Sequence, residues 1–151
     1  MEVFRICKEK YSTSLISSGS ANRWNERGQK VLYTCSTRSL ATLELIVHSS
    51  SVVPGTDYRV LVISISDKDN LLRLIQTADL PVNWRKMEAY SALQRMGSKW
   101  YKNRETLILK VPSAVIPAEY NYIINTELPD FERHVQLVRS EDYFRDERLL
   151  N

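Results

Sequence analysis

The strongest constraint on the fold is the segment 57–66, which is extended and apolar on both faces. Its apolar side chains alternate between one face, with Tyr58, Val60 and Val62, and the other, with Leu61, Ile63 and Ile65. A strand that is apolar on both faces belongs in the interior of a sheet that is covered on each side. The chain is therefore predicted to form such a sheet, with this segment as an inner strand.

The rest of the pattern predicts an α+β fold. Further short strands are expected at 3–7, 31–35, 106–111, 121–125 and 135–138. Helices are expected at 38–49 and within 84–104, with Gly97 near a turn. Strands outnumber helices and do not alternate with them regularly, which argues against a doubly wound parallel sheet. Neither a Gly-x-Gly-x-x-Gly motif nor a P-loop is present, so a bound nucleotide would have to be held in another way.

Length and composition describe one globular domain spanning residues 1–151. The hydrophobic share is 43% and the charged share is 26%, as in ordinary globular proteins. The net charge of +3 comes from scattered residues and is weak support for a nucleic-acid partner. No apolar run approaches the ~18 residues of a membrane span, and residues 1–10 lack the apolar core of a signal peptide. We therefore expect a cytoplasmic protein that does not bind membranes.

The two cysteines, Cys7 and Cys35, are predicted to be reduced thiols in core strands. Two cysteines are too few for a disulfide framework, and they lack metal-ligand spacing, so no metal site is expected. A catalytic cysteine would need a histidine partner. The sequence pairs neither His48 nor His134 with a cysteine.

The helix expected at 38–49 carries one carboxylate, Glu44, which faces inward if Thr42 faces water. Its apolar residues spread around most of the helical wheel, so we expect the helix to be largely buried. Only the direction of Thr42 is free of apolar neighbours, and Glu44 points nearly opposite to it. An inward carboxylate is costly unless it is paired or used. The residues alone leave open a salt bridge to a core arginine, a solvated helix face and a functional carboxylate.

The polar stretch 11–27 is predicted to be a long loop, of a kind that is usually functional or disordered. Within it Arg23 stands beside Trp24 and could clamp a phosphate with its planar guanidinium, although a surface arginine beside an anchoring tryptophan would look the same. Other polar and aromatic residues fit structural positions when each is taken alone: a core strand for Tyr33, a turn for Ser113, and strand edges or turns for Asn121 and Asn125.

Four blocks together resemble the RES domain, a bacterial toxin family named for an Arg, a Glu and a Ser. The blocks are Gly19-Ser20-Ala21-Asn22-Arg23-Trp24-Asn25 with Gly28 and Val31-Leu32-Tyr33, then 39–48, then 111–117 continuing through Glu119, Asn121 and Asn125 to Phe131, and the tail 144–149. They follow the family's order from Phe4 to Leu149 and so span nearly the whole chain. Two departures are Ala21-Asn22, where many members have Gly-Gly, and Leu128, where a histidine is expected.

The resemblance implies a fold similar to that of ADP-ribosyltransferases, in which small packed β-sheets and a few helices hold NAD⁺ without a Rossmann motif. It implies a toxin that degrades NAD⁺, as substrate rather than cofactor, by cleaving the bond between nicotinamide and ribose with water or phosphate. It also implies a cognate helix-turn-helix antitoxin whose C-terminal segment plugs the active site, and association of the toxin as a dimer.

On this resemblance, each candidate residue has an expected role. Arg23 contacts the pyrophosphate or a ribose-side oxygen, and Tyr33 stacks on the nicotinamide ring. Glu44 hydrogen-bonds the ribose hydroxyls and stabilises developing positive charge, while Ser113 hydrogen-bonds the nicotinamide ribose or amide or positions the nucleophile. Asn25 and Asn125 are weaker candidates for orienting ligands. Arg5 is expected to be either a second phosphate contact or a structural residue.

The residues are also compatible with other functions. The same site could transfer ADP-ribose to a protein, because the acceptor depends on access to the cleft. The positive charge and the Arg and Trp residues could instead belong to a small nucleic-acid-binding module, although basic residues and aromatics do not interleave on one element. A purely structural partner protein would gain nothing from an inward Glu44 and a polar loop.

Overall fold

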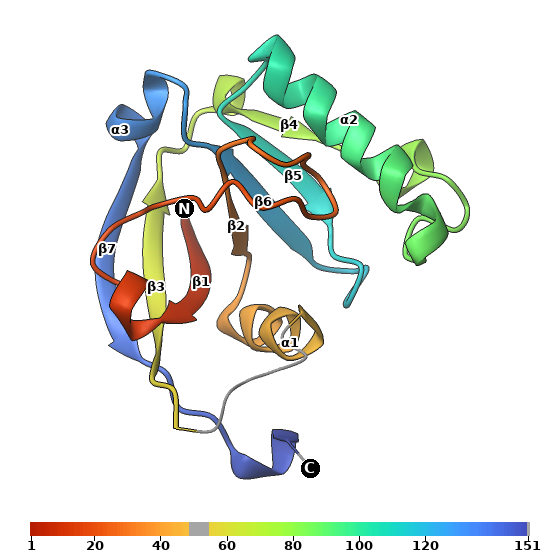
Figure 1. The fold of residues 1–151 in the computed structure, drawn as a ribbon. Helices are drawn as coiled ribbons and strands as arrows, with labels where there is room; N and C mark the ends of the chain where they lie inside the picture. Colours follow the sequence, from red (N-terminus) through yellow and green to blue (C-terminus); the bar gives the residue numbers. More distant parts are fainter. Residues whose placement is uncertain (49–54, 151) are drawn as a thin grey trace.

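The computed structural model describes residues 1–48 and 55–150, and within them seven strands form one mixed sheet (Figure 1). The order across the sheet is β4-β5-β6-β2-β1-β3-β7. The strands are β1 (Glu2–Lys8), β2 (Val31–Cys35), β3 (Tyr58–Ile65), β4 (Leu72–Leu74), β5 (Ile108–Pro112), β6 (Tyr120–Asn125) and β7 (Val135–Asp142). The α-helices are α1 (Arg38–His48), α2 (Tyr90–Asn103) and α3 (Asp130–His134). All pairs are antiparallel except β4 with β5.

The sheet divides at its centre, between β1 and β2. β1 pairs with β3 along its whole length, from Glu2 opposite Ser64 to Lys8 opposite Tyr58. By contrast, β1 meets β2 in register only where Phe4 lies opposite Cys35. Figure 1 shows the two strands standing apart, with α1 below them. The sheet therefore consists of a β1-β3-β7 half and a β4-β5-β6-β2 half that diverge on either side of this junction.

Strand alternation sorts the core into three clusters on the two faces of the sheet. One face carries a single cluster that joins both halves, including Val3, Leu61 and Ile63 from one half and Leu32 and Ile124 from the other. The opposite face carries two clusters. Trp24, Trp84, Trp100, Leu93 and Ile123 pack where α2 covers the sheet, and Phe4, Leu40, Ala41, Val60 and Val62 pack where α1 covers it. The two longer helices thus cover the same face, separated along the sheet.

The expected strands and the α+β class are confirmed. Segment 57–66 contains β3, which lies between β1 and β7 as an inner strand. The structure adds β4, which is only three residues long and was not predicted. Such a short strand shows little periodicity, and its place is set by parallel pairing with β5. No helix of the described residues is long and apolar enough to cross a membrane.

The expectation that Gly97 lies near a turn is wrong, because Gly97 lies in the middle of α2. An added Cβ at this position would lie 1.9 Å from the carbonyl oxygen of Trp24. Because Gly97 has no side chain, the backbone of α2 can contact the backbone of the segment before β2. The side chain of Gln94, one turn earlier, donates to the carbonyl oxygen of Asn22 at 3.0 Å, which reinforces the same contact.

The expectation that the helix at 38–49 is largely buried is also wrong. Leu40 and Ala41 are buried, but Val47 is 62% exposed. The helix lies at one end of the sheet, so only the side that faces β1 and β2 is covered. The position Ser49, at the end of the expected helix, lies outside the described residues.

Candidate active site

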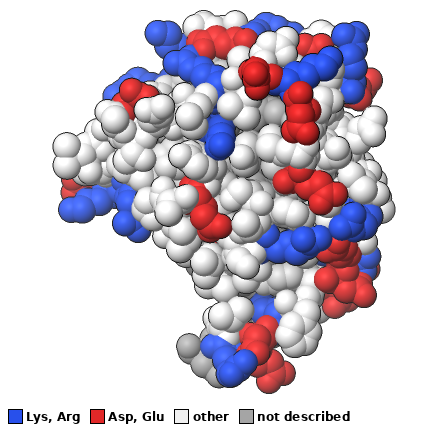
Figure 2. All heavy atoms as spheres, turned by 180° about the vertical axis from the view of Figure 1, so that it is seen from behind, with Lys and Arg blue, Asp and Glu red and all other residues white. Residues whose placement is uncertain are grey.

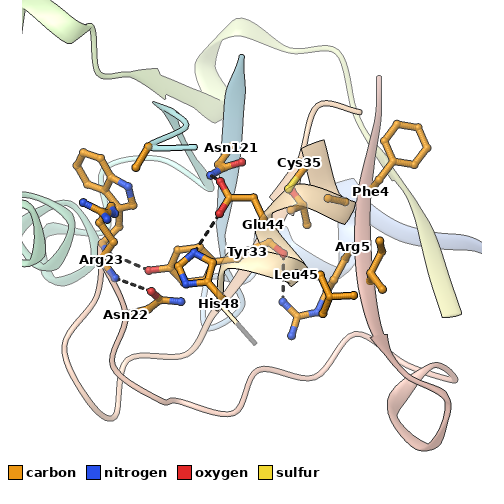
Figure 3. Close-up of a pocket in the computed structure, with 15 residues that line it drawn as sticks. Phe4, Arg5, Asn22, Arg23, Tyr33, Cys35, Glu44, Leu45, His48 and Asn121 are labelled. Carbon is orange, nitrogen blue, oxygen red and sulfur yellow. Dashed lines mark hydrogen bonds and ion pairs between the residues drawn. The ribbon is translucent and has the colours of Figure 1, made fainter. Parts of the chain in front are cut away.

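A pocket lies at the junction of the two sheet halves, on the face covered by α1 and α2. Its volume is about 200 Å³. The side chains that line it come from the first two strands, α1, the segment 22–24, the loop after β5, and β6: Phe4, Arg5, Ile6, Asn22, Arg23, Trp24, Tyr33, Thr34, Cys35, Ala41, Glu44, Leu45, His48, Ala114 and Asn121. Elements far apart in the sequence therefore meet at one cavity (Figure 3).

The Glu44 carboxylate is held by three side chains. Ser113 Oγ donates to Glu44 Oε1 at 2.8 Å, and Asn121 Nδ2 donates to the same oxygen at 2.7 Å. His48 Nε2 lies 3.0 Å from Glu44 Oε2. Figure 3 shows Glu44 between Asn121 and His48. Because the Glu44 side chain is only 14% exposed, the inward direction expected from the helical wheel is confirmed.

Burial and hydrogen bonding act on the pKa of Glu44 in opposite directions. Burial raises the pKa, while hydrogen bonds from His48, Asn121 and Ser113 lower it, and the net pKa lies below the ordinary value. Hydrogen bonds stabilise the charged form of a carboxylate, and here they outweigh desolvation. The pocket therefore holds a fixed negative charge at neutral pH.

Local sequence explains how α1 presents Glu44. Thr37 Oγ1 accepts the amide hydrogen bond of Leu40 at 3.0 Å, which satisfies a free donor at the start of the helix. Residues four apart share a helix face, so His48 lies above Glu44. Leu40 and Ala41 pack this end of the helix against Phe4 and Cys35.

Tyr33 is anchored through its hydroxyl and lines the pocket. Its Oη donates to Asn25 Oδ1 at 2.6 Å and accepts from the Trp24 amide at 3.1 Å. Burial raises the pKa of Tyr33 above its ordinary value, and the hydrogen bond from the Trp24 amide opposes this only in part. The phenol thus stays neutral and acts as a fixed aromatic wall.

Arg23 lines the pocket but already has partners. Its guanidinium donates to the carbonyl oxygens of Trp84 at 3.0 Å and Arg85 at 3.5 Å. It also lies over the ring of Tyr90, 5.3 Å from the centroid. Its positive charge has no carboxylate partner among the described residues. Arg23 therefore holds the segment before β2 to the 84–85 loop, and its charge stays available at the pocket wall.

Arg5 is less engaged than Arg23. Its Nη1 donates to the carbonyl oxygen of Tyr33 at 3.1 Å, which bridges β1 and β2 where their ladder has stopped. Burial lowers the pKa of Arg5, and the nearby thiols of Cys7 and Cys35 oppose this. Within residues 1–48 and 55–150, no carboxylate forms an ion pair with it.

Cys35 also lines the pocket, but it is poorly suited to act as a nucleophile. Burial and the nearby charge of Glu44 raise its pKa to about 12. The thiol is therefore protonated at neutral pH, whereas the thiolate is the reactive form. Cys7 and Cys35 are both free, as expected. The described residues contain no group of three or more His, Cys, Asp and Glu side chains arranged to hold a metal ion.

Comparison with known proteins shows the family to which the chain belongs. The RES domain pattern matches residues 2–146. The chain belongs to the RES domain family. A relative named "Toxin Res" from Photorhabdus laumondii is 30% identical over 99% of this chain and 97% of its own length. The "Prs ADP-ribosylating toxin" of a Sphingobium species is 35% identical over 74% of this chain and 70% of its own length.

A solved structure shares the fold of this RES domain. It is a chain from the M. tuberculosis MbcT-MbcA toxin-antitoxin complex, with a TM-score of 0.73 and 16% identity. The alignment covers 94% of this chain and 83% of that one. The mixed sheet with few helices is thus an arrangement that this chain shares with a solved structure.

The structure brings most of the candidate residues of the RES domain together, but not all of them. Arg5, Arg23, Tyr33 and Glu44 line the pocket, and Ser113 reaches it through its bond to Glu44. Asn25 and Asn125, like Ser113, are not among the residues that line the pocket.

Asn25 is buried and its amide donates to the carbonyls of Ser20 and Glu26. Asn125 lies opposite Val31, four residues along β6 from Asn121, and its Oδ1 accepts from the Glu127 amide. The side chains of both asparagines therefore form hydrogen bonds with backbone groups. Asn25 supports the pocket only through its hydrogen bond with Tyr33.

Two of the three residues that hydrogen-bond Glu44 were not assigned a functional role from the sequence. His48 could have been found, because a residue four positions after Glu44 shares its helix face. Asn121 contacts Glu44 from 77 residues away, so no local signal could have found it. The departure Ala21-Asn22 is accommodated without strain, since neither residue has a positive φ. Leu128 packs against the large core cluster, away from the pocket.

Proposed function

We propose that this RES domain chain is a toxin that depletes NAD⁺ by cleaving the bond between nicotinamide and ribose. The observation that carries the proposal is the Glu44 carboxylate, only 14% exposed and held by Ser113, Asn121 and His48 in a pocket that also contains two arginines. NAD⁺ combines a cationic ring, a ribose and a pyrophosphate. A fixed carboxylate, an aromatic wall and arginines offer complementary groups for each part.

The chemistry requires stabilisation of positive charge more than acid catalysis. When the bond from ribose C1′ to the nicotinamide nitrogen breaks, its electron pair neutralises the ring nitrogen, and the ribose gains oxocarbenium character. A carboxylate that is already oriented stabilises that charge without reorganising. The oxygen of water or phosphate then bonds to C1′, and water loses its proton to solvent.

The remaining residues have proposed roles that fit their contacts. Tyr33, fixed by its hydroxyl, would stack on the nicotinamide ring. Ser113 would position Glu44 rather than touch the nucleophile, because it is fully buried and its Oγ already donates to the carboxylate. Arg23 and Arg5 would contact phosphate oxygens. Asn25 would act through Tyr33.

ADP-ribosyl transfer to a protein is the second candidate function. The Sphingobium relative, named for ADP-ribosylating Prs, favours it at 35% identity. The same cleavage would occur, with a protein side chain replacing water or phosphate as the acceptor. Products distinguish these reactions: free ADP-ribose indicates hydrolysis, its 1″-phosphate indicates phosphorolysis, and a modified protein indicates transfer.

The face of the molecule in Figure 2 offers little support for nucleic-acid binding. Figure 2 shows one face of the molecule, on which Lys and Arg are interspersed with Asp and Glu. A binding stripe for a phosphate backbone would instead be continuous and basic. Salt-sensitive binding of DNA or RNA by the purified chain would revive this alternative.

A cognate antitoxin is part of the proposal. The names of the relatives and the toxin-antitoxin complex of the structural neighbour support such a partner. We further propose a helix-turn-helix antitoxin, a cytoplasmic location and a dimeric toxin. Co-expression with the neighbouring gene product, followed by size-exclusion chromatography with light scattering, tests the partner and the dimer together.

Loss of NAD⁺ with time, with and without phosphate, tests the activity. Glu44→Gln keeps the shape of the side chain but removes its charge, so kcat should fall by about 10²–10³. Glu105→Gln also removes a carboxylate charge, but at a position outside the pocket, and serves as the matched control. NAD⁺ turnover by Glu44→Gln at the control rate would rule out the assigned role of Glu44.

A further inference from the structure

A second pocket lies on the other face of the sheet at the same junction. Its volume is about 310 Å³, and it is lined largely by apolar side chains of the first three strands and of the segment 11–18. Strand alternation places Cys7 and Leu32 of this pocket on the face opposite Ile6 and Tyr33 of the first. The two pockets therefore flank the β1–β2 junction from opposite sides.

Arg5 is the one residue shared by the linings of the two pockets. It belongs to β1 just beyond Phe4, where register pairing with β2 stops, and its side chain bridges to the Tyr33 carbonyl. A guanidinium has five donor N–H groups, and only this one hydrogen bond is formed within the described residues. A partly buried cation without a carboxylate partner favours binding of an anion from outside.

We infer that the second pocket holds the adenosine end of the dinucleotide, with the pyrophosphate at Arg5 and the nicotinamide riboside end at Glu44. This inference rests on the proposed function and names a subsite for it. The substrate has a heterocycle at each end and a dianion between them. The chain has a pocket on each side of the junction and, between them, an arginine that forms no ion pair with a carboxylate of the described residues.

The surroundings of the second pocket suit an adenine ring rather than a charged group. Arg5 is its one charged lining residue, and Leu15, Leu32 and Leu61 offer apolar surface. Tyr11 is 59% exposed and Ile16 is 70% exposed, so apolar side chains stand at its rim without cover from the described residues. Ser14 and Ser18 supply hydroxyls that can hydrogen-bond a base or ribose.

Ile16→Glu tests the subsite, because it replaces apolar rim surface with a charge that repels a nucleotide. Val138→Glu, at a half-exposed position on β7 outside both pockets, is the matched control. The first measurement is calorimetric binding of adenosine monophosphate, which does not depend on turnover. We expect Ile16→Glu to weaken binding about tenfold or more and Val138→Glu to leave it within about twofold.

The second measurement compares NAD⁺ with nicotinamide mononucleotide, which has the same scissile bond but no adenosine. Ile16→Glu should lower kcat/KM for NAD⁺ about tenfold and leave the value for the mononucleotide nearly unchanged. Equal losses for both substrates, or unchanged adenosine monophosphate binding, would overturn the inference. If neither substrate is cleaved but adenosine monophosphate binding responds to Ile16→Glu, the subsite stands and the proposed function fails.

Discussion

At the scale of single residues, the main feature of the site is the Glu44 carboxylate, whose hydrogen bonds lower its pKa by more than burial raises it. Desolvation raises the pKa of Glu44, and hydrogen bonds from His48, Asn121 and Ser113 together lower it by a larger amount. A carboxyl whose pKa is depressed by folding adds stability above its unfolded pKa, and this stability is lost as pH falls through the folded pKa. The site and the fold therefore share a dependence on the ionised form of Glu44.

Replacement of His48 by alanine should raise the pKa of Glu44, because the largest of the lowering hydrogen bonds is removed while burial remains. As pH falls, activity should then be lost at a higher pH than in the wild type. Arg5, Arg23 and Cys35, which line the same pocket, are unchanged in the variant. The measurement is the pH profile of kcat/KM, and His48→Gln, which keeps an N–H donor, should shift it less. An acid limb that does not move would contradict this account.

Arg23 has two tasks, and a substitution should affect both. Arg23→Ala removes a charge from the pocket wall and releases the carbonyls of Trp84 and Arg85. We expect the KM for NAD⁺ to rise more than kcat falls, with a cost of about 1–3 kcal/mol in the free energy of unfolding. Steady-state kinetics and urea denaturation measure the two effects separately. An unchanged KM would show that Arg23 is structural and does not contact the substrate.

At the scale of elements, two helices on one face of the sheet frame the pocket. α1 carries Glu44 and His48, and its first turn is capped by Thr37. α2 carries no pocket-lining residue. Its contribution is to hold the segment that supplies Asn22, Arg23 and Trp24, through contacts that include Gly97.

Gly97→Ala should therefore damage the site from a distance. The new Cβ would collide with the Trp24 carbonyl, which is backbone and cannot rotate away, so α2 or the segment 22–24 must shift. We expect a loss of about 1–3 kcal/mol in the free energy of unfolding, as for other overpacked cores, together with weaker NAD⁺ turnover. Ser91→Ala, on the exposed side of α2, is the control and should change stability by less than about 0.5 kcal/mol. Equal stability of both variants in urea would contradict the close packing.

At the scale of the whole molecule, a shared core compensates for the weak strand junction. β1 and β2 meet in register at one residue pair, yet one hydrophobic cluster contains Leu61 and Ile63 from one half and Leu32 and Ile124 from the other. Divergence of the strands on top of a continuous core opens space for a ligand without separating the halves. The site thus lies where the sheet is least continuous, while this cluster still joins the two halves on the other face.

The chain should therefore unfold in one cooperative transition. All three tryptophans, Trp24, Trp84 and Trp100, belong to the cluster beneath α2, so their fluorescence reports on that half. Far-ultraviolet circular dichroism reports on the whole sheet. The two urea transitions should coincide within error, as expected for a two-state domain. A fluorescence midpoint clearly separated from the circular dichroism midpoint would show that the halves unfold independently.

The sequence by itself determined the strands whose side chains alternate, because alternation follows from the geometry of a strand. The helical wheel allowed an inward Glu44 but left a solvated position open, and the structure decided between them. The resemblance to the family made Arg23, Tyr33 and Ser113 candidate site residues. Only the tertiary structure decided which groups reach the carboxylate, since Ser113 and Asn121 lie 69 and 77 residues from Glu44. It also decided that Asn125 lies at the other end of β6, and that Gly97 is a contact rather than a turn. Burial and pairing between distant segments depend on how elements pack, and no local pattern encodes that packing.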